Sequence, residues 1–183
     1  MLFNPYVSST VVPRRMIRVG LLSDTHGLLR DGALRHLRGC DHIVHGGDIG
    51  GAAGGAAGGA EILERLAALA PLTAVRGNND AGPWAQRLQE TEIVAVGTIA
   101  ICVVHNLAEL DLPACVRATP NLRVVVSGHS HKPSISERDG VLLVNPGSCG
   151  PRRFSLPVSL GELVIRGADF DARIIELTGA QLA

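Results

Sequence analysis

The sequence predicts an α/β fold. From Met16 onward, short runs rich in Val, Ile and Leu alternate with amphipathic stretches, which is the pattern of strands connected by helices. Polar side chains directly follow most of the strand-like runs, as expected where a sheet presents its functional loops. The chain has 183 residues, near the usual length of one domain. We therefore expect a tail over residues 1–15 and a single domain over residues 16–183.

In the first half of the chain, three strand-like runs alternate with two helix-like stretches. In each of the two stretches the leucine and isoleucine residues recur at helical spacing, so that they fall on one face. The expected strands with their following loops are MIRVGLLSD, HIVHGGD and LTAVRGNND, and the expected helices are Asp31–Arg38 and Glu61–Leu69.

A low-complexity segment, GGAAGGAAGGA, occupies residues 50–60 between the second strand and the second helix. Glycine raises the entropic cost of ordering the backbone, so this segment predicts a loop insert. A neutral loop is the simpler interpretation. A flexible lid beside a site is the alternative, because the segment closely follows Asp48.

In the second half of the chain, paired strands dominate. TEIVAV and TIAICVVH are divided by Gly97 and predict an antiparallel hairpin. A helix is expected over Ala108–Ala118, with Pro113 in its first turns. LRVVVSGHSH predicts a further strand and loop, ISERDGVLLVNPGS a hairpin turning at Asp139-Gly140, and VSLGELVIRGADFDARIIEL two closing strands around Gly167.

Composition narrows the class of protein. Apolar residues make up 46% of the chain and charged residues 19%, which is ordinary globular composition. No uncharged apolar run approaches the ~18 residues that a membrane span requires, and the first residues lack a signal-peptide pattern, so we expect a cytoplasmic protein without a membrane partner. The four cysteines form no C-x-x-C pair and are expected to be buried apolar residues.

Charge also bears on the expected partners. Seventeen basic residues balance seventeen acidic ones, and the five aromatic residues offer few surfaces on which bases could stack, so the sequence does not favour a nucleic-acid partner. An edge strand in the C-terminal hairpin could pair with a second copy, which leaves a homo-oligomer open.

Seven metal-capable side chains follow the predicted strands. Residues two apart at a strand end point to the same side, so Asp24 with His26, and His129 with His131, can each send two side chains into one pocket. Mixed carboxylate, amide and imidazole donors suit divalent ions, with manganese expected and iron, zinc, nickel or magnesium as alternatives. Taken singly, each residue is more often a turn, cap or core residue, but the ordered set predicts a metal site. The predicted ligands are Asp24, His26, Asp48, Asn78, His105, His129 and His131.

The blocks LLSDTHG, HGGDI, VRGNND, VVH, SGHSHKP and NPGS together resemble the calcineurin-like metallophosphoesterase superfamily. They are most similar to its small bacterial and archaeal single-domain phosphodiesterases, over about residues 16–177. The resemblance implies an α/β four-layer α/β/β/α sandwich with two mixed β-sheets around two divalent metal ions. It places Asp24, His26, Asp48 and His131 on one ion and Asp48, Asn78, His105 and His129 on the other, with Asp48 bridging.

The resemblance also implies an activity. A hydroxide held between the two ions would attack phosphorus in line, which makes the chain a phosphodiesterase acting on a small phosphate ester. The residues expected to carry catalysis are Asp48, Asn78, Asp80 and His131. Of these, Asp80 is expected to orient Asn78 or a neighbouring histidine, while His45 is expected to pack beneath the site.

Two positions depart from the family pattern. Asn79 stands where the family often has a histidine that protonates the leaving group, and an amide cannot do this. General acid catalysis contributes ~100- to 10,000-fold, so we expect weak turnover of esters with poor leaving groups unless His131, bound water or the substrate supplies the proton. Asn106 follows His105 where glycine is usual. Arg76, Arg152 and Arg153 are candidate substrate contacts, with a structural or solvated role as the default.

Two alternatives remain open. The first is a phosphomonoesterase or nucleotide phosphatase that uses the same chemistry. The second is a non-catalytic scaffold on the same fold, because a eukaryotic retromer subunit related to this branch serves mainly as a binding platform. Every ligand position of this chain retains a coordinating side chain, which favours an enzyme over a scaffold.

Overall fold

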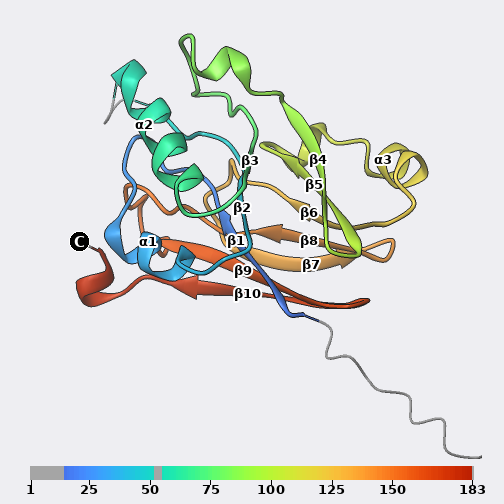
Figure 1. The fold of residues 1–183 in the computed structure, drawn as a ribbon. Coiled ribbons are helices and arrows are strands. Elements are labelled where there is room, and N and C mark those ends of the chain that lie inside the picture. Colours follow the sequence, from blue (N-terminus) through green and yellow to red (C-terminus); the bar gives the residue numbers. More distant parts are fainter. Residues whose placement is uncertain (1–14, 52–54, 183) are drawn as a thin grey trace, which may run out of the picture.

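A computed structural model describes residues 15–51 and 55–182 of the chain. These residues form two five-stranded mixed β-sheets that pack face to face, with helices on their outer faces (Figure 1). The predicted α/β/β/α sandwich is confirmed. The predicted tail lies outside the described residues apart from Arg15.

The first sheet has the strand order β10-β9-β1-β2-β3. Its strands β1, β2 and β3 are parallel, and the β9–β10 hairpin joins β1 in antiparallel fashion. Because the three parallel strands end at the same edge, their following loops are brought together there. The bounds are β1 Ile17–Leu22, β2 His42–His45, β3 Leu72–Ala74, β9 Ser159–Arg166 and β10 Asp169–Glu176.

The second sheet has the order β4-β5-β6-β8-β7. The β4–β5 and β7–β8 hairpins are antiparallel, as predicted, whereas β5, β6 and β8 are parallel. Asp139 and Gly140 both have positive φ at the β7–β8 turn, the conformation that a tight two-residue hairpin requires. The bounds are β4 Thr91–Val96, β5 Ile99–Val104, β6 Leu122–Val126, β7 Ser134–Arg138 and β8 Val141–Asn145.

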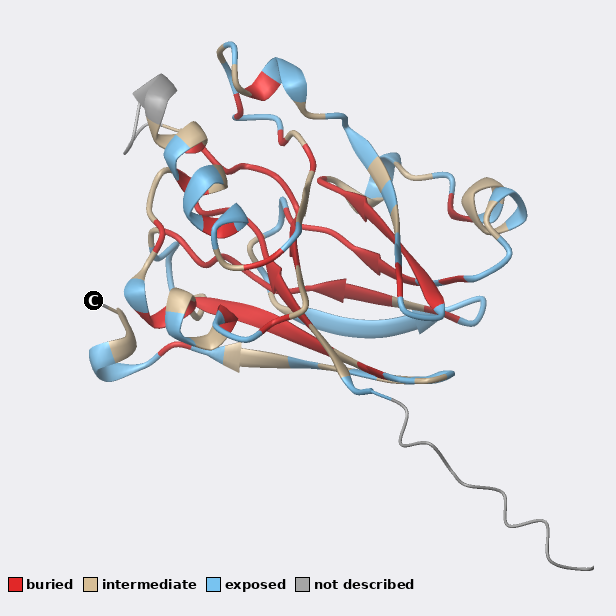
Figure 2. Ribbon diagram, in the orientation of Figure 1, coloured by how far each residue is buried: buried red, intermediate tan, exposed pale blue. Residues whose placement is uncertain are grey.

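Three apolar clusters hold the layers together. The central cluster lies between the sheets, with Val19 and Leu163 on one side and Ile101 and Val124 on the other. The inner strands are accordingly buried along most of their length in Figure 2. The other two clusters pack α1 (Asp31–Leu37) and α2 (Gly55–Ala67) on the first sheet, and α3 (Leu112–Ala118) on the second.

The loop formed by the Gly/Ala-rich segment is shorter than predicted. Helix α2 begins at Gly55 rather than Glu61, so the expected loop over residues 50–60 is wrong in its second half, while residues 52–54 lie outside the described part. A Cβ at Gly50 would lie 2.6 Å from the Trp84 ring, and one at buried Gly59 would collide with it. The helix therefore continues through the glycines because packing on Trp84 outweighs their low helix propensity.

The expected helix over Ala108–Ala118 also begins later. A 3₁₀ turn, η2 (Leu107–Glu109), comes first, and α3 begins after Asp111, whose side chain accepts a hydrogen bond from the Ala114 amide. Asp111 thus caps the helix, with Pro113 in its first turn. Two further 3₁₀ turns are η1 (Ala85–Arg87) and η3 (Gly179–Leu182).

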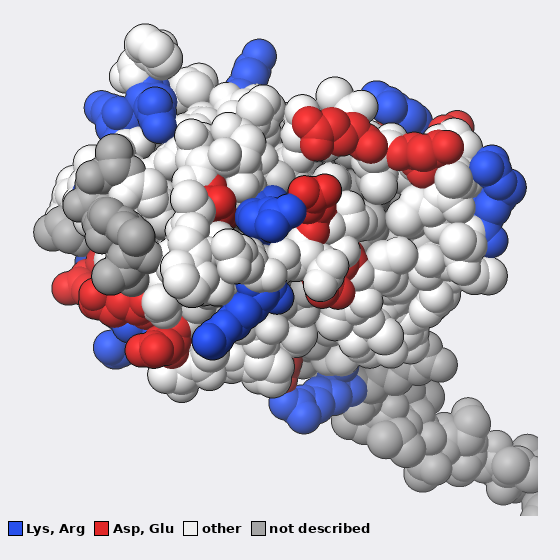
Figure 3. All heavy atoms as spheres, turned by 90° about the horizontal axis from the view of Figure 1, so that it is seen from above, with Lys and Arg blue, Asp and Glu red and all other residues white. Residues whose placement is uncertain are grey.

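Acidic and basic side chains are interspersed over the face shown in Figure 3. No broad field of one sign covers this face. Within residues 15–51 and 55–182, no helix has the length and apolar character needed to cross a bilayer.

Candidate metal centre

Backbone hydrogen bonds join the loops that carry the predicted ligands. The Asp24 amide donates to Gly47 O over 3.0 Å, and the His26 amide donates to Asp48 O over 3.0 Å, so the loops after β1 and β2 are tied together. On the second sheet, the Gly128 amide donates to His105 O over 3.0 Å. Hydrogen bonds therefore tie the ligand loops together within each sheet.

Two glycines permit this close approach. A Cβ at Gly77 would collide with the Asp48 backbone and carboxylate, and one at Gly128 would collide with Ser23 Oγ. Any larger residue would force the loops apart. The glycines before Asn78 and His129 are thus required by packing between loops that come from distant parts of the sequence.

The backbone conformation marks the same residues. A positive φ is uncommon for residues other than glycine and costs of order 1–3 kcal/mol. Five of the seven predicted ligands have it, and outside them the described non-glycine residues with positive φ are Asp139 and Phe154. The five ligands are Asp24 (55°), His26 (45°), Asp48 (54°), His129 (68°) and His131 (58°). Strain of this kind persists where the surrounding structure over-determines it, as at functional sites.

Asp24, His26 and His131 form one group whose ligand atoms lie within 4.8 Å of one another. The two histidine Nε2 atoms are 3.2 Å apart, and His131 Nε2 lies 3.3 Å from Asp24 Oδ1. Three donor atoms thus face a single point between the loops after β1 and β6.

Asp48, His105, Asn78 and His129 lie beside this group. His105 Nε2 is 3.4 Å from Asp48 Oδ2 and 2.9 Å from Asn78 Oδ1, which in turn is 3.0 Å from His129 Nδ1. Asp24 also belongs to a second group of mutually close ligand atoms, together with Asp48 and His105. The structure therefore brings all seven predicted ligands into one cluster.

The Asp24 carboxylate is the clearest indication that these residues fit a cation. Its side chain is fully buried, and Oδ1 accepts no hydrogen bond among the described residues. Burial, reinforced by the charge of Asp48 and opposed by the Ser23 hydroxyl, raises the pKa of Asp24 to about 7. A buried carboxylate oxygen without a partner is costly, and it faces imidazole nitrogens that are common metal ligands. These residues fit a divalent cation.

Asp48 is held in the ionised form. Burial acts against ionisation, but hydrogen bonds from His105 and Asn79 outweigh it and lower the pKa of Asp48 well below its usual range. Asn79 makes two of these bonds, from its backbone amide over 2.8 Å and from Nδ2 over 2.7 Å. Sequence reasoning missed this role of Asn79, because no local pattern connects it to a residue 31 positions earlier.

Two neighbouring histidines have defined roles. His105 Nδ1 lies 2.8 Å from Gly46 O and must donate to it. A metal would therefore be bound by the lone pair of Nε2, in place of the contacts that this nitrogen makes with Asp48 and Asn78. His45 is fully buried and hydrogen-bonded to Thr25 Oγ1 and the Gly47 amide, and burial lowers its pKa to about 3. It packs beneath the ligand loops as expected.

Asp80 supports the loops through their backbone. Its carboxylate accepts hydrogen bonds from the amides of Gly50 (2.9 Å) and Gly77 (2.8 Å). Among the described residues, the Asp80 carboxylate makes no hydrogen bond to Asn78 or to a histidine side chain, so this expectation is corrected: Asp80 braces the backbone before Asn78. Ser148 serves a similar purpose by donating to Asp24 O over 2.9 Å.

An open cavity of about 450 Å³ adjoins the cluster. Asn78 and His129 are exposed to it, so the site is open on this side. Asn106 also lines the cavity, where its side chain accepts from the Ala108 amide and donates to Glu109, which explains the departure from glycine. The remaining lining residues are Arg76, Gly77, Asp80, Glu90, Thr91, Val104, His105 and Glu109.

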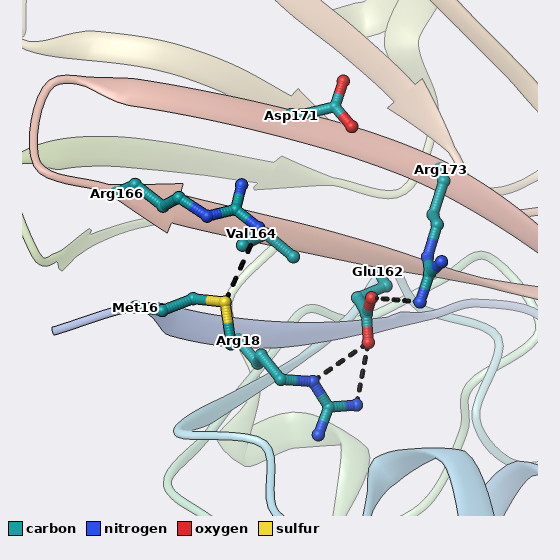
Figure 4. Close-up of a pocket in the computed structure, with 7 residues that line it drawn as sticks. All are labelled: Met16, Arg18, Glu162, Val164, Arg166, Asp171 and Arg173. Atoms are coloured by element: carbon teal, nitrogen blue, oxygen red, sulfur yellow. Dashed lines mark hydrogen bonds and ion pairs between the residues drawn. The ribbon is translucent and has the colours of Figure 1, made fainter.

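A second charged cavity, of about 380 Å³, lies on the outer face of the first sheet (Figure 4). Here Glu162 is buried between two arginines: Arg18 Nη2 lies 2.7 Å away and Arg173 Nη2 2.6 Å away. Arg166 contacts the Met16 sulfur. Because both of its counter-charges come from the chain itself, Glu162 has a structural role.

The four-layer sandwich with a carboxylate–imidazole cluster at the strand ends defines a candidate metal-dependent protein. A comparison with family models matches residues 17–166 to the calcineurin-like phosphoesterase superfamily domain, and the chain belongs to this family. A probable metallophosphoesterase of Methanothermobacter thermautotrophicus is 32% identical over 171 residues, covering 88% of this chain and 93% of the relative.

Solved structures support the fold. An archaeal phosphodiesterase matches with a TM-score of 0.66 at 19% identity, covering 87% of this chain and 100% of that chain. Vps29 of Entamoeba histolytica in complex with Zn²⁺ matches with a TM-score of 0.63 at 20% identity, covering 87% of this chain and 99% of that chain.

Proposed function

We propose that this chain is a binuclear metal-dependent phosphodiesterase. The observation that carries the proposal is a pair of overlapping ligand groups, one formed by Asp24, His26 and His131 and the other by Asp24, Asp48 and His105. Two groups that share a buried carboxylate suit two neighbouring cations better than one.

The distances suggest how the ligands would be divided. Asp48 Oδ2 lies 3.8 Å from His26 Nε2 and 3.4 Å from His105 Nε2, so it lies between the two groups. We assign Asp48 as the bridging ligand, with His26 and His131 on one side and Asn78, His105 and His129 on the other. Asp24 belongs to both groups by distance, and we assign it to the first ion because its Oδ1 lies 3.3 Å from His131 Nε2.

Divalent ions bound here would lower the pKa of bound water and neutralise charge on a phosphate ester. The chain contributes two carboxylates, Asp24 and Asp48, against the four positive charges of two ions, so the centre would attract an anion. Asn78 and His129 leave the site open towards the cavity, where the ester would enter.

The position of Asn79 favours diesters with good leaving groups. Both of its nitrogen donors are bound to Asp48, so this residue stabilises the bridging carboxylate and supplies no proton. His131 directs Nε2 at His26 and Asp24, so we assign it as a ligand rather than an acid. We propose manganese as the working ion on the basis of the mixed oxygen and nitrogen donors.

Paired chromogenic esters test this function. Manganese-loaded protein should hydrolyse bis(4-nitrophenyl) phosphate with a higher kcat/KM than 4-nitrophenyl phosphate, and Asp48→Asn should lower kcat/KM for the diester roughly a thousandfold. Asp171→Asn makes the same exchange on an exposed position of β10 and should retain wild-type turnover. Wild-type turnover in Asp48→Asn would contradict the proposal, and preference for the monoester would replace it with a phosphomonoesterase.

The likeness to Vps29 favours a binding scaffold as the second candidate. A scaffold on this fold would bind ions through the same cluster without turning over either ester. Metal-loaded protein that binds manganese tightly but hydrolyses neither compound would decide for the scaffold.

A further inference from the structure

Two of the four cysteines lie side by side. The Cys115 thiol on α3 donates to Cys102 on β5, with their two Sγ atoms 3.8 Å apart. Helix α3 covers the outer face of the second sheet, where both residues belong to one apolar cluster (Figure 1). The packing of helix on strand therefore already holds the two sulfur atoms in van der Waals contact.

The two thiols differ in their access to solvent. Cys102 is fully buried, whereas Cys115 is only partly buried, which departs from the four buried cysteines that the sequence predicts. Burial, reinforced by the neighbouring thiol, raises the pKa of Cys102 to about 12, so this group stays protonated at neutral pH. An oxidant that arrives from solvent meets Cys115 first. An accessible thiol beside a second thiol is the arrangement found at disulfide-forming redox sites.

The other two cysteines show a different environment. Cys40 and Cys149 are buried in the cluster between the first sheet and its helices. Neither makes a sulfur–sulfur contact within the described part of the chain, and the Cys40 thiol instead faces His36 O over 4.0 Å. Burial raises the pKa of Cys149 to about 12, which keeps it protonated. The close pair of thiols is thus confined to Cys102 and Cys115.

A disulfide between them requires a small local movement. An S–S bond is about 2.05 Å long, so the sulfur atoms must approach each other by about 1.8 Å. Helix α3 is seven residues long, and Pro113 and Arg117 on it are exposed. It takes no part in the central cluster between the sheets, so it can shift this far without opening that core.

The segment between the two cysteines carries part of the metal centre. His105 follows β5 directly, and Asn106 and Glu109 line the adjoining cavity. A bond between Cys102 and Cys115 would close a covalent ring that contains these residues. Such a ring restricts the unfolded chain and so opposes unfolding of this wall of the site.

We propose that Cys102 and Cys115 form a redox modification site, which hydrogen peroxide converts into an intramolecular disulfide. The peroxide first oxidises the Cys115 thiol to a sulfenic acid and is reduced to water. The Cys102 sulfur then attacks the Cys115 sulfur, the S–S bond forms, and the sulfenic oxygen leaves as a second water. In total, two thiols and one peroxide give one disulfide and two waters.

Counting free thiols tests this site. Reduced wild type that is unfolded and labelled with N-ethylmaleimide should carry four adducts by mass spectrometry. Protein treated with peroxide before unfolding should carry adducts on Cys40 and Cys149 alone, and dithiothreitol should restore all four. Cleavage after Glu109 divides the chain between Cys102 and Cys115, so the two fragments should stay joined after oxidation and separate after reduction.

Two variants separate the pair from the other thiols. Cys115→Ser should lose no adduct on peroxide treatment, whereas Cys40→Ser, the matched control, should lose the same pair as wild type. Oxidised wild type should also melt about 5 °C above the reduced protein, a shift that Cys115→Ser should not show.

Three results would overturn the inference. They are four adducts on peroxide-treated wild type, sulfinic acid on Cys115 without a bond to Cys102, and a disulfide that contains Cys40 or Cys149. The fragments of wild type decide among these results even if a variant does not fold.

Discussion

Two buried carboxylates, Glu162 on β9 and Asp24 in the loop that follows the neighbouring strand β1, differ in where their counter-charge comes from. Glu162 on β9 pairs with Gly20 of β1, four residues before Asp24. Glu162 is surrounded by the cations Arg18 and Arg173 (Figure 4), whereas one oxygen of Asp24 has no hydrogen-bond donor. The chain itself supplies the counter-charge for Glu162. The counter-charge for Asp24 would come from a bound cation.

The pKa values of the two groups move in opposite directions. Burial acts against ionisation of Glu162, but the hydrogen bond and charge of Arg18, followed by Arg173, lower its pKa. Burial raises the pKa of Asp24 to about 7 because no comparable cation opposes it. The difference separates a self-contained structural network from a cluster that is incomplete without a cation.

The largest predicted effect is on the metal-free protein at Asp24. Because folding raises its pKa from 3.8 to about 7, the folded state binds the proton more tightly, and stability falls as pH rises across this range. Asp24→Asn removes that loss and should raise the free energy of unfolding by about 3 kcal/mol at pH 8. Urea unfolding in the presence of a chelator measures it.

At pH 3.5 the same two proteins should have nearly equal stability, since wild-type Asp24 is then protonated in the folded state and mostly protonated in the unfolded state. Excess manganese should reverse the order at pH 8, because wild type gains the binding energy. A variant that is less stable than metal-free wild type at pH 8 would contradict the description of Asp24.

Glu162→Gln should change the free energy of unfolding in the opposite direction, by lowering it. Its lowered pKa contributes stability above the unfolded value of 4.5, and this contribution is lost as pH falls through the folded pKa. The variant should lose about 2 kcal/mol at pH 7, since hydrogen bonds to a charged group are removed. Thermal unfolding at pH 7 and pH 3 gives both values, and a deficit that persists undiminished at pH 3 would count against the pairing.

The smallest predicted effect on stability concerns Phe154, which has a φ of 51° in the loop between β8 and β9. Phe154→Gly relieves a left-handed conformation worth ~1–2 kcal/mol but increases the entropy of the unfolded chain, so we expect a net gain of about 0.5 kcal/mol. Asp139→Gly, at the tight turn between β7 and β8, makes the same exchange at another residue with positive φ and provides the comparison. Denaturant midpoints should rise in Phe154→Gly, and a clear fall would show that the Phe154 side chain stabilises the loop.

The sequence predicted the ligand loops well because their signals are local. A glycine before Asn78 or His129, at the end of a β-branched run, is visible in the chain itself. The hydrogen bonds from Asn79 to Asp48, and from the Gly50 amide to Asp80, depend on contacts between distant segments and left no local pattern. For the same reason, the start of α2 at Gly55 could not be predicted, because the helix depends on packing against Trp84.

The stoichiometry of metal binding tests the central claim most directly. Chelator-treated protein is titrated with manganese and the bound ions per chain are counted for wild type, Asp48→Asn and Glu162→Gln. We predict about two ions for wild type and for Glu162→Gln, and fewer for Asp48→Asn, which lacks the bridging carboxylate. Wild type that binds no manganese, or Asp48→Asn that binds as much as wild type, would contradict the account.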